Sequence, residues 1–210
     1  MKKHDVHEFF RRLKESNPQP KSDLQYTNPF TLLVAVVLSA QSTDAGVNKA
    51  TRKLFTIADT PEKMLRLGLE KLKEHIKTIG LYNTKAKNII ALSEILIRDH
   101  AGKIPDSREE LTKLPGVGRK TANVVLNVAF NQPTMAVDTH IFRVSNRSGL
   151  APGKTPEAVE DALMKSVPAE FALNAHHWLI LHGRYICKAR KPDCPSCPVN
   201  DICAFKEKTG

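Results

Sequence analysis

Apolar residues recur at helical spacing along most of the chain, and no segment alternates convincingly with the period of two that is typical of a strand. Residues 6–13 predict a basic amphipathic helix, whose apolar face carries Val6, Phe9, Phe10 and Leu13. Residues 29–40 (PFTLLVAVVLSA) are apolar nearly all round but much too short to span a bilayer, so they predict a buried core helix. The pattern therefore predicts an all-α fold.

Other periodic segments also predict helices, and several open with a residue that can cap a helix. Ser42 or Thr43 could cap a helix at residues 45–56, and Ser107 with Glu110 forms a capping box. The remaining expected helices are a short one from Thr60-Pro61, residues 69–79, a helix that follows residues 79–88 and ends near His100, and residues 108–114, 138–145, 156–167 and 169–186. Residues 17–20 (NPQP) and 131–133 (NQP) interrupt the pattern and mark crossings between two parts of the chain.

The stretch from Leu111 to Val144 holds the pattern around which the chain is organised. Residues 115–118 (PGVG) stop one helix and turn the chain tightly. A second helix then opens at Arg119, with its apolar side predicted to consist of Val124, Val125, Val128 and Ala129. Two helices joined by a glycine hairpin leave free amide N–H groups at the turn, and such groups attract phosphate.

The charge of the chain is consistent with such a ligand. Lysine and arginine exceed aspartate and glutamate by ten (32 against 22), which suits a polyanionic partner, although a merely soluble basic protein would show the same excess. Aromatic residues make up only 6%, which disfavours a stacking platform for single strands. Because the N-terminus lacks an apolar signal region and no run reaches membrane-spanning length, we expect a cytoplasmic protein without a membrane partner.

Four cysteines lie close together near the C-terminus: Cys187, Cys194, Cys197 and Cys203. In a reducing compartment such a group indicates metal ligands before disulfides. The spacing is C-x6-C-x2-C-x5-C, in which the single C-x2-C pair could begin a zinc site. On spacing alone, zinc and an iron–sulfur cluster remain equally open.

Together these motifs resemble a known family. LPGVGRKTA followed by VDTHIFRV is similar to the helix-hairpin-helix and "Gly/Pro-Asp" active site of the endonuclease III family of DNA glycosylases. The cysteine spacing matches the [4Fe–4S] loop of the same family, and the likeness covers essentially the whole chain. The resemblance implies a two-lobed, all-α helix-hairpin-helix glycosylase fold. Its helical bundle domain would span residues 21–132, and residues 1–20 plus 133–210 would form a discontinuous iron–sulfur cluster domain.

The resemblance also implies a function. Members with lysine at the position of Lys120 are bifunctional DNA glycosylases with AP-lyase activity, and they excise oxidised or ring-damaged pyrimidines from duplex DNA in base-excision repair. We expect a monomer that binds damaged double-stranded DNA, associated with the nucleoid in a bacterium. The adenine-mismatch branch is the closest alternative, but it typically lacks the lysine and adds a C-terminal recognition domain. A DNA-binding module without catalysis, held together by zinc or an iron–sulfur cluster, is an alternative of another class.

Two residues carry the implied chemistry. An amine that attacks the sugar C1′ gives a Schiff base, which permits β-elimination of the 3′-phosphate. Lys120 lies in the first turn of a helix, whose positive end disfavours an ammonium, but it could also be one more phosphate-binding lysine. Asp138 is a good N-cap for the helix that follows, and a carboxylate that accepts helix amides stays ionised. We therefore expect Asp138 to stabilise the cationic sugar and to assist as a base, and we assign no role to His140.

The remaining expected site residues contact DNA. By resemblance, Gln41 fills the space left by the flipped nucleotide, although a polar residue at a helix end would look the same. Leu81 is either buried against a neighbouring helix or a wedge between base steps, and the resemblance favours the wedge. The hairpin residues Gly116, Val117, Gly118 and Arg119, and Lys191 in the cysteine loop, are expected at phosphates. Lys85 and Asn88 weakly echo the Lys-x-x-Asn spacing of Lys120 and Asn123.

Overall fold

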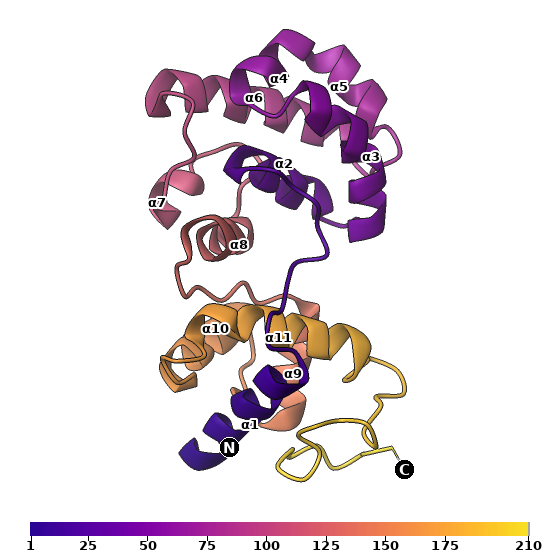
Figure 1. Cartoon of the computed structure of the whole chain (residues 1–210), viewed down its shortest axis with the longest axis vertical. Coiled ribbons are helices and arrows are strands. Elements are labelled where there is room, and N and C mark those ends of the chain that lie inside the picture. Colours follow the sequence, from indigo (N-terminus) through magenta and orange to yellow (C-terminus); the bar gives the residue numbers. More distant parts are fainter. Residues whose placement is uncertain (210) are drawn as a thin grey trace. The chain divides into compact units, whose positions relative to one another are not determined.

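The computed structural model describes residues 1–209, and their regular structure consists of eleven helices and no strand (Figure 1). The all-α prediction is therefore confirmed for the described part of the chain. Gly210, the last residue of the expected iron–sulfur domain, lies outside the described residues. Among residues 1–209 no helix is both long enough and apolar enough to cross a membrane.

The chain divides into two compact units. One consists of Ser22–Asn131, and the other combines Met1–Lys21 with Gln132–Gly210. Each unit has a hydrophobic core of its own. The unit boundary near Asn131 follows the end of a helix, where Asn131 adopts a left-handed conformation (φ 52°) and its amide bonds to Leu126 O. Asparagine tolerates this conformation better than most residues, and such a C-cap ends a helix sharply.

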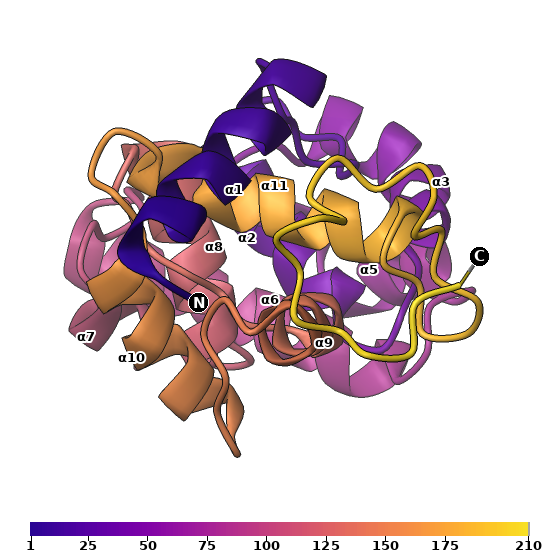
Figure 2. The ribbon, with the colours of Figure 1, turned by 90° about the horizontal axis from the view of Figure 1, so that it is seen from below.

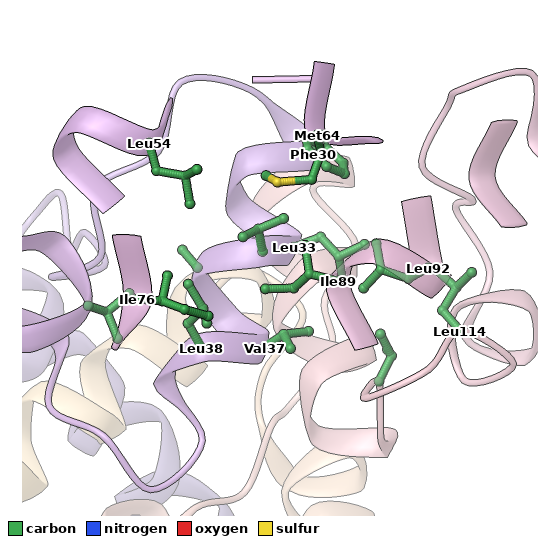
Figure 3. Packing of buried hydrophobic residues seen from close by; sticks show 14 of the residues in the cluster. Phe30, Leu33, Val37, Leu38, Leu54, Met64, Ile76, Ile89, Leu92 and Leu114 are labelled. Atoms are coloured by element: carbon green, nitrogen blue, oxygen red, sulfur yellow. The ribbon is translucent and has the colours of Figure 1, made fainter. Parts of the chain in front are cut away.

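The unit Ser22–Asn131 is a helical bundle built around α2 (Pro29–Ser39). Every residue of α2 from Phe30 to Leu38 is buried, as the apolar run predicts. Figure 3 shows Leu33, Val37 and Leu38 of α2 surrounded by side chains of the neighbouring helices. The other helices of this unit are α3 (Asp44–Ile57), α4 (Pro61–Leu67), α5 (Leu69–Ile76), α6 (Tyr82–His100), α7 (Arg108–Leu111) and α8 (Arg119–Phe130).

Local capping chemistry sets where several of these helices begin. Asn28 accepts from the Thr31 amide while the Thr31 hydroxyl accepts from the Asn28 amide, which forms a capping box at the start of α2. Thr43, rather than Ser42, caps α3 by accepting from the Gly46 amide. Ser107 caps α7 through the amide of Glu110, as its position in the sequence predicts.

Several local expectations were wrong. α5 ends at Ile76 and α7 at Leu111, each three residues early, because the chain continues in tight turns in which the amides of Ile79 and Leu114 bond to Ile76 O and Leu111 O. α9 continues to Ser148 and not only to residue 145, and α11 begins at Ala172 and not at residue 169, because a turn closed by the Ala172 amide and Ala169 O precedes it. The buried residues of α8 are Ala122, Asn123, Val125, Leu126 and Asn127, whereas Val124, Val128 and Ala129 are only half-buried. The face is therefore rotated from the predicted one, and the three adjacent apolar residues Val124, Val125 and Leu126 leave such a rotation undecided in the sequence.

The second unit consists of α1 (Lys3–Ser16), α9 (Thr139–Ser148), α10 (Pro156–Ser166) and α11 (Ala172–Tyr185), followed by the cysteine loop. α11 packs on α9 and on α1, and Figure 2 shows α1 crossing α11. The four predicted apolar residues of α1 are all buried. The indole of Trp178 on α11 donates to Asn17 O at 2.8 Å, which fixes the end of α1.

Candidate DNA-binding and iron–sulfur sites

The turn before α8 requires glycine at position 116. Gly116 has φ 79°, in the left-handed region, and a Cβ there would lie 2.9 Å from Asn88 Nδ2. Glycine is therefore needed both for its backbone conformation and for the space that Asn88 fills. The Val117 amide donates to Leu114 O at 3.0 Å and its side chain is buried, so Val117 fixes the turn by packing.

The start of α8 is suited to an anion. Gly118 is the N-cap and offers no side-chain cap, and the first amides of any α-helix lack an intrahelical acceptor. The positive end of the helix dipole adds to their attraction for phosphate. Arg119 and Lys120 are the first two residues of the helix, and both are exposed. Lys120 thus presents an accessible amine beside an anion-binding helix terminus.

Gln41 and Leu81 lie on adjacent loops with the same unusual backbone conformation. Their φ angles are 55° and 59°, which non-glycine residues rarely adopt. Both side chains are exposed, Leu81 to 64%, so the interpretation of Leu81 as a buried core residue is excluded. A Cβ on Gly80 would come within 3.9 Å of the Gln41 carbonyl oxygen, which places the two loops side by side. A strained backbone that holds an exposed leucine is more typical of a functional site than of a packing site.

Asp138 belongs to the second unit, whereas Lys120 belongs to the first. Asp138 is the N-cap of α9, as predicted, and its Oδ1 accepts from the amides of His140 at 2.9 Å and Ile141 at 2.8 Å. Both amides bond to the same oxygen, so the cap engages one side of the carboxylate. Asp138 is half-buried and lies at the N-terminal, positive end of α9.

The four cysteines line one cavity of the second unit, together with apolar residues that include Val144 and Val199. Burial, and after it the charges of the three neighbouring cysteines, raises the pKa of the Cys197 thiol to about 11. Four thiolates can share such an apolar space only with a compensating positive charge, which the iron ions of a cluster supply. The residues therefore fit an iron–sulfur cluster.

Two arginines of α9 fix the start of the cysteine loop, and the sequence analysis missed both. Arg143 donates to Cys187 O at 3.0 Å and to Gly183 O at 2.7 Å. Arg147 donates to the carbonyls of Lys188 and Ala189, and its guanidinium lies 4.9 Å from the Phe205 ring centre. Their spacing of four residues places them on one face of a helix, which is the one signal that the sequence offered.

Lys191 lies in the same loop and is exposed, with φ 49°. Pro192 follows it, and the residue before a proline is disfavoured in helical conformations, so the loop holds Lys191 in a strained state. The Asp193 amide, which bonds to Ile186 O at 2.9 Å, closes the loop behind it. The loop therefore presents Lys191 outward from a fixed turn.

Known proteins similar to the chain agree with these features. The model of the HhH-GPD superfamily of base excision DNA repair proteins matches residues 34–169, and that of the iron-sulfur binding domain of endonuclease III matches residues 187–203. Endonuclease III of Escherichia coli (strain K12) and that of Haemophilus influenzae are each 61% identical over 201 residues, which is 96% of this chain and 95% of theirs. The solved structure of a trapped endonuclease III–DNA covalent intermediate matches with a TM-score of 0.90 and 47% identity, over 97% of this chain and 96% of that one.

Proposed function

The chain belongs to the HhH-GPD superfamily of base excision DNA repair proteins and, within it, to the endonuclease III family, and on this premise we propose which residues perform the repair reaction. The protein is a DNA glycosylase with AP-lyase activity that binds DNA and carries a [4Fe–4S] cluster. Its substrates are duplexes that contain oxidised or ring-damaged pyrimidines. It acts as a monomer in the cytoplasm of a bacterium, at the nucleoid.

Lys120 is the nucleophile. Its neutral amine forms a bond to the sugar C1′ while the damaged base leaves with the electrons of the glycosidic bond and takes up a proton. Opening of the sugar ring then gives an imine between Lys120 and C1′. Loss of a proton from C2′ moves electrons toward this imine and expels the 3′-phosphate, which breaks the strand by β-elimination. Asp138 stabilises the positive charge that develops on the sugar and assists in taking the proton from the amine.

The other residues hold the DNA. The amides of Gly116 and Gly118 and the side chain of Arg119 bind backbone phosphates at the start of α8, while buried Val117 shapes the turn. Leu81 enters the base stack as a wedge, and Gln41 fills the space that the flipped nucleotide leaves. Lys191 contributes a phosphate contact from the cysteine loop.

Cys187, Cys194, Cys197 and Cys203 are the ligands of the cluster. When bound, the cluster fixes the path of the loop and neutralises the charge of four thiolates. All four cysteines are then used as ligands, so none serves as a nucleophile. The chain itself positions the loop from outside through Arg143 and Arg147.

The observation that carries the proposal is the exposed Lys120 amine in the first turn of α8, directly after the hairpin. Borohydride added during turnover on a duplex with an oxidised pyrimidine should reduce the imine and link enzyme and DNA covalently. Lys120→Gln should abolish trapping and strand cleavage together, whereas Lys113→Gln, at an exposed lysine just before the hairpin, should keep both. Full trapping by Lys120→Gln would assign the nucleophile to another amine, and base excision without any trapping by the unaltered protein would favour the adenine-mismatch branch.

A further inference from the structure

Lys85, in the first turn of α6, is buried: only 5% of its surface is exposed, which is unusual for a lysine. Its amine donates to Leu38 O at 2.9 Å, Ala40 O at 2.6 Å and Ser42 Oγ at 3.1 Å. A buried ammonium is costly unless all its protons are bonded, and here three acceptors match the three N–H donors. Two of the acceptors are carbonyls at the C-terminal end of α2, where the helix dipole is negative. Burial lowers the pKa of the Lys85 amine.

Lys85 also contacts the Leu81 turn, through its main chain. The Lys85 amide donates to Leu81 O at 3.0 Å, so its backbone holds the left-handed turn at Leu81 while its side chain holds both neighbours of Gln41. The side-chain contacts to the end of α2 and the Gln41 loop cross 43 to 47 residues of sequence, whereas the main-chain contact to Leu81 is local. Gly80, with its Cβ position 3.9 Å from Gln41 O, shows that the loops are in contact without an intervening side chain.

We propose that Lys85 is a positioning residue that locks the Gln41 loop to the Leu81 turn and thereby makes recognition of a damaged site possible. The inference rests on the proposed roles of Gln41 and Leu81 in the DNA. Two exposed side chains can probe a duplex together only if their separation is fixed before binding, because ordering a loop during binding costs affinity. One buried residue provides that fixed separation, because its amine is bonded to the Gln41 loop and its main-chain amide to the Leu81 turn.

α6 extends the same alignment to the phosphate-binding hairpin. Leu81, Lys85 and Asn88 follow one another at spacings of four and three residues, so they lie on one side of the helix. Asn88 packs against Gly116 closely enough that a Cβ there would clash. α6 therefore fixes the Gln41 loop and the Leu81 turn relative to the hairpin. The weak Lys-x-x-Asn echo in the sequence corresponds to the two side chains that make these contacts, Lys85 and Asn88.

The test replaces Lys85 by methionine, which keeps a long unbranched stem and removes the charged donor. Lys87→Met, at an exposed lysine two residues away, is the matched control. In the free protein, amide hydrogen exchange in residues 40–43 and 80–83 should accelerate by about tenfold or more in Lys85→Met, because these segments open locally. The preference for a duplex with a tetrahydrofuran abasic analogue over an undamaged duplex should fall by about tenfold, which is about 1.4 kcal/mol. Affinity for undamaged duplex should change little, and Lys87→Met should match the unaltered protein in both measurements.

A double-mutant cycle separates positioning from general loss of stability. In a Gln41→Ala background, Lys85→Met should reduce the preference for the abasic analogue much less than it does alone, because the side chain that it positions is already absent. If Lys85→Met does not fold, Ser42→Ala removes one of the three acceptors and should produce smaller changes in the same direction. Unchanged exchange, an unchanged preference, or an equal effect of Lys85→Met in both backgrounds would overturn the inference. A failure of the proposed function looks different, because the unaltered protein would then show no preference for the abasic analogue.

Discussion

Arg143 and Arg147 lie one helical turn apart on α9 and together donate to four main-chain carbonyls where α11 meets the cysteine loop. Asp138 caps the opposite end of the same helix. At the C-terminal end of α9 the Ala204 amide bonds to Ser148 O at 3.1 Å, which attaches the far end of the loop as well. α9 is therefore a rigid link between the proposed sugar-stabilising carboxylate and the cysteine loop.

Arg147→Lys should make the protein lose its iron–sulfur cluster more readily. A lysine keeps the charge, but it lacks the planar fork that donates to Lys188 O and Ala189 O from two separate nitrogens, and it cannot lie flat against Phe205. Loss of these contacts should cost about 1–3 kcal/mol. The cluster's visible absorbance should then decay faster in the presence of an iron chelator. Arg190→Lys, at an exposed arginine of the same loop, is the control, and equal decay of both variants would contradict the role of Arg147.

Gly116→Ala should destabilise the helical bundle unit and weaken duplex binding. The left-handed φ costs alanine about 1–2 kcal/mol, and its Cβ would lie 2.9 Å from Asn88 Nδ2. Adding Asn88→Ala removes the clash but not the backbone strain, so the double variant should recover part of the lost unfolding free energy. Gly118→Ala is the control, because Gly118 has φ −89° and open space at its Cβ position, so the lost unfolding free energy should be much smaller than in Gly116→Ala and limited to the poorer N-cap. Equal losses at both glycines would contradict this account.

Lys191→Ala should reduce the salt dependence of duplex binding. Each phosphate that the protein neutralises contributes about 0.9 to the slope of log affinity against log salt. The slope should therefore become smaller by roughly that amount, while the preference for damaged over undamaged duplex stays the same. Lys154→Ala, at an exposed lysine of the same unit, should leave the slope unchanged. If Lys191→Ala also leaves it unchanged, the cysteine loop does not contact phosphate.

The features that the sequence predicted well are local. The apolar run of α2 and the single apolar face of α1 each decide which residues are buried, whatever the rest of the chain does. Thr43, Thr60 and Ser107 cap helices with atoms only three residues away. The glycine hairpin and the cysteine spacing are also local patterns, and they carried the resemblance to the family.

The features that could not be predicted from the sequence depend on contacts between distant segments. Apart from the weak Lys-x-x-Asn echo, nothing near Lys85 in the sequence distinguishes it from Lys87, yet Lys85 is buried against α2 and Lys87 is exposed. Arg143 and Arg147 find carbonyls 40 to 44 residues away, so their function depends on how α9 packs on α11. The rotation of the buried face of α8 is likewise decided by its packing against α2. Periodicity predicts that a face is buried, but the choice between adjacent valines depends on the neighbouring helix.

Asp138→Asn separates the charge of this residue from its structural role. The amide oxygen of asparagine can accept from the His140 and Ile141 amides as Oδ1 does, and asparagine is as good an N-cap as aspartate. Thermal stability and affinity for an abasic-analogue duplex should therefore stay close to those of the unaltered protein. Base excision in single turnover should fall on the order of 10²–10³-fold, because a preformed charge acts mainly on the transition state.

Asp138→Ala is the matched comparison for this test. It removes both the charge and the cap, so it should lose a similar amount of activity and in addition about 1 kcal/mol of unfolding free energy. Asp138→Asn should thus resemble Asp138→Ala in excision rate and the unaltered protein in stability. If the excision rate of Asp138→Asn stays near that of the unaltered protein, Asp138 acts as a helix cap and not as the group that stabilises the sugar cation.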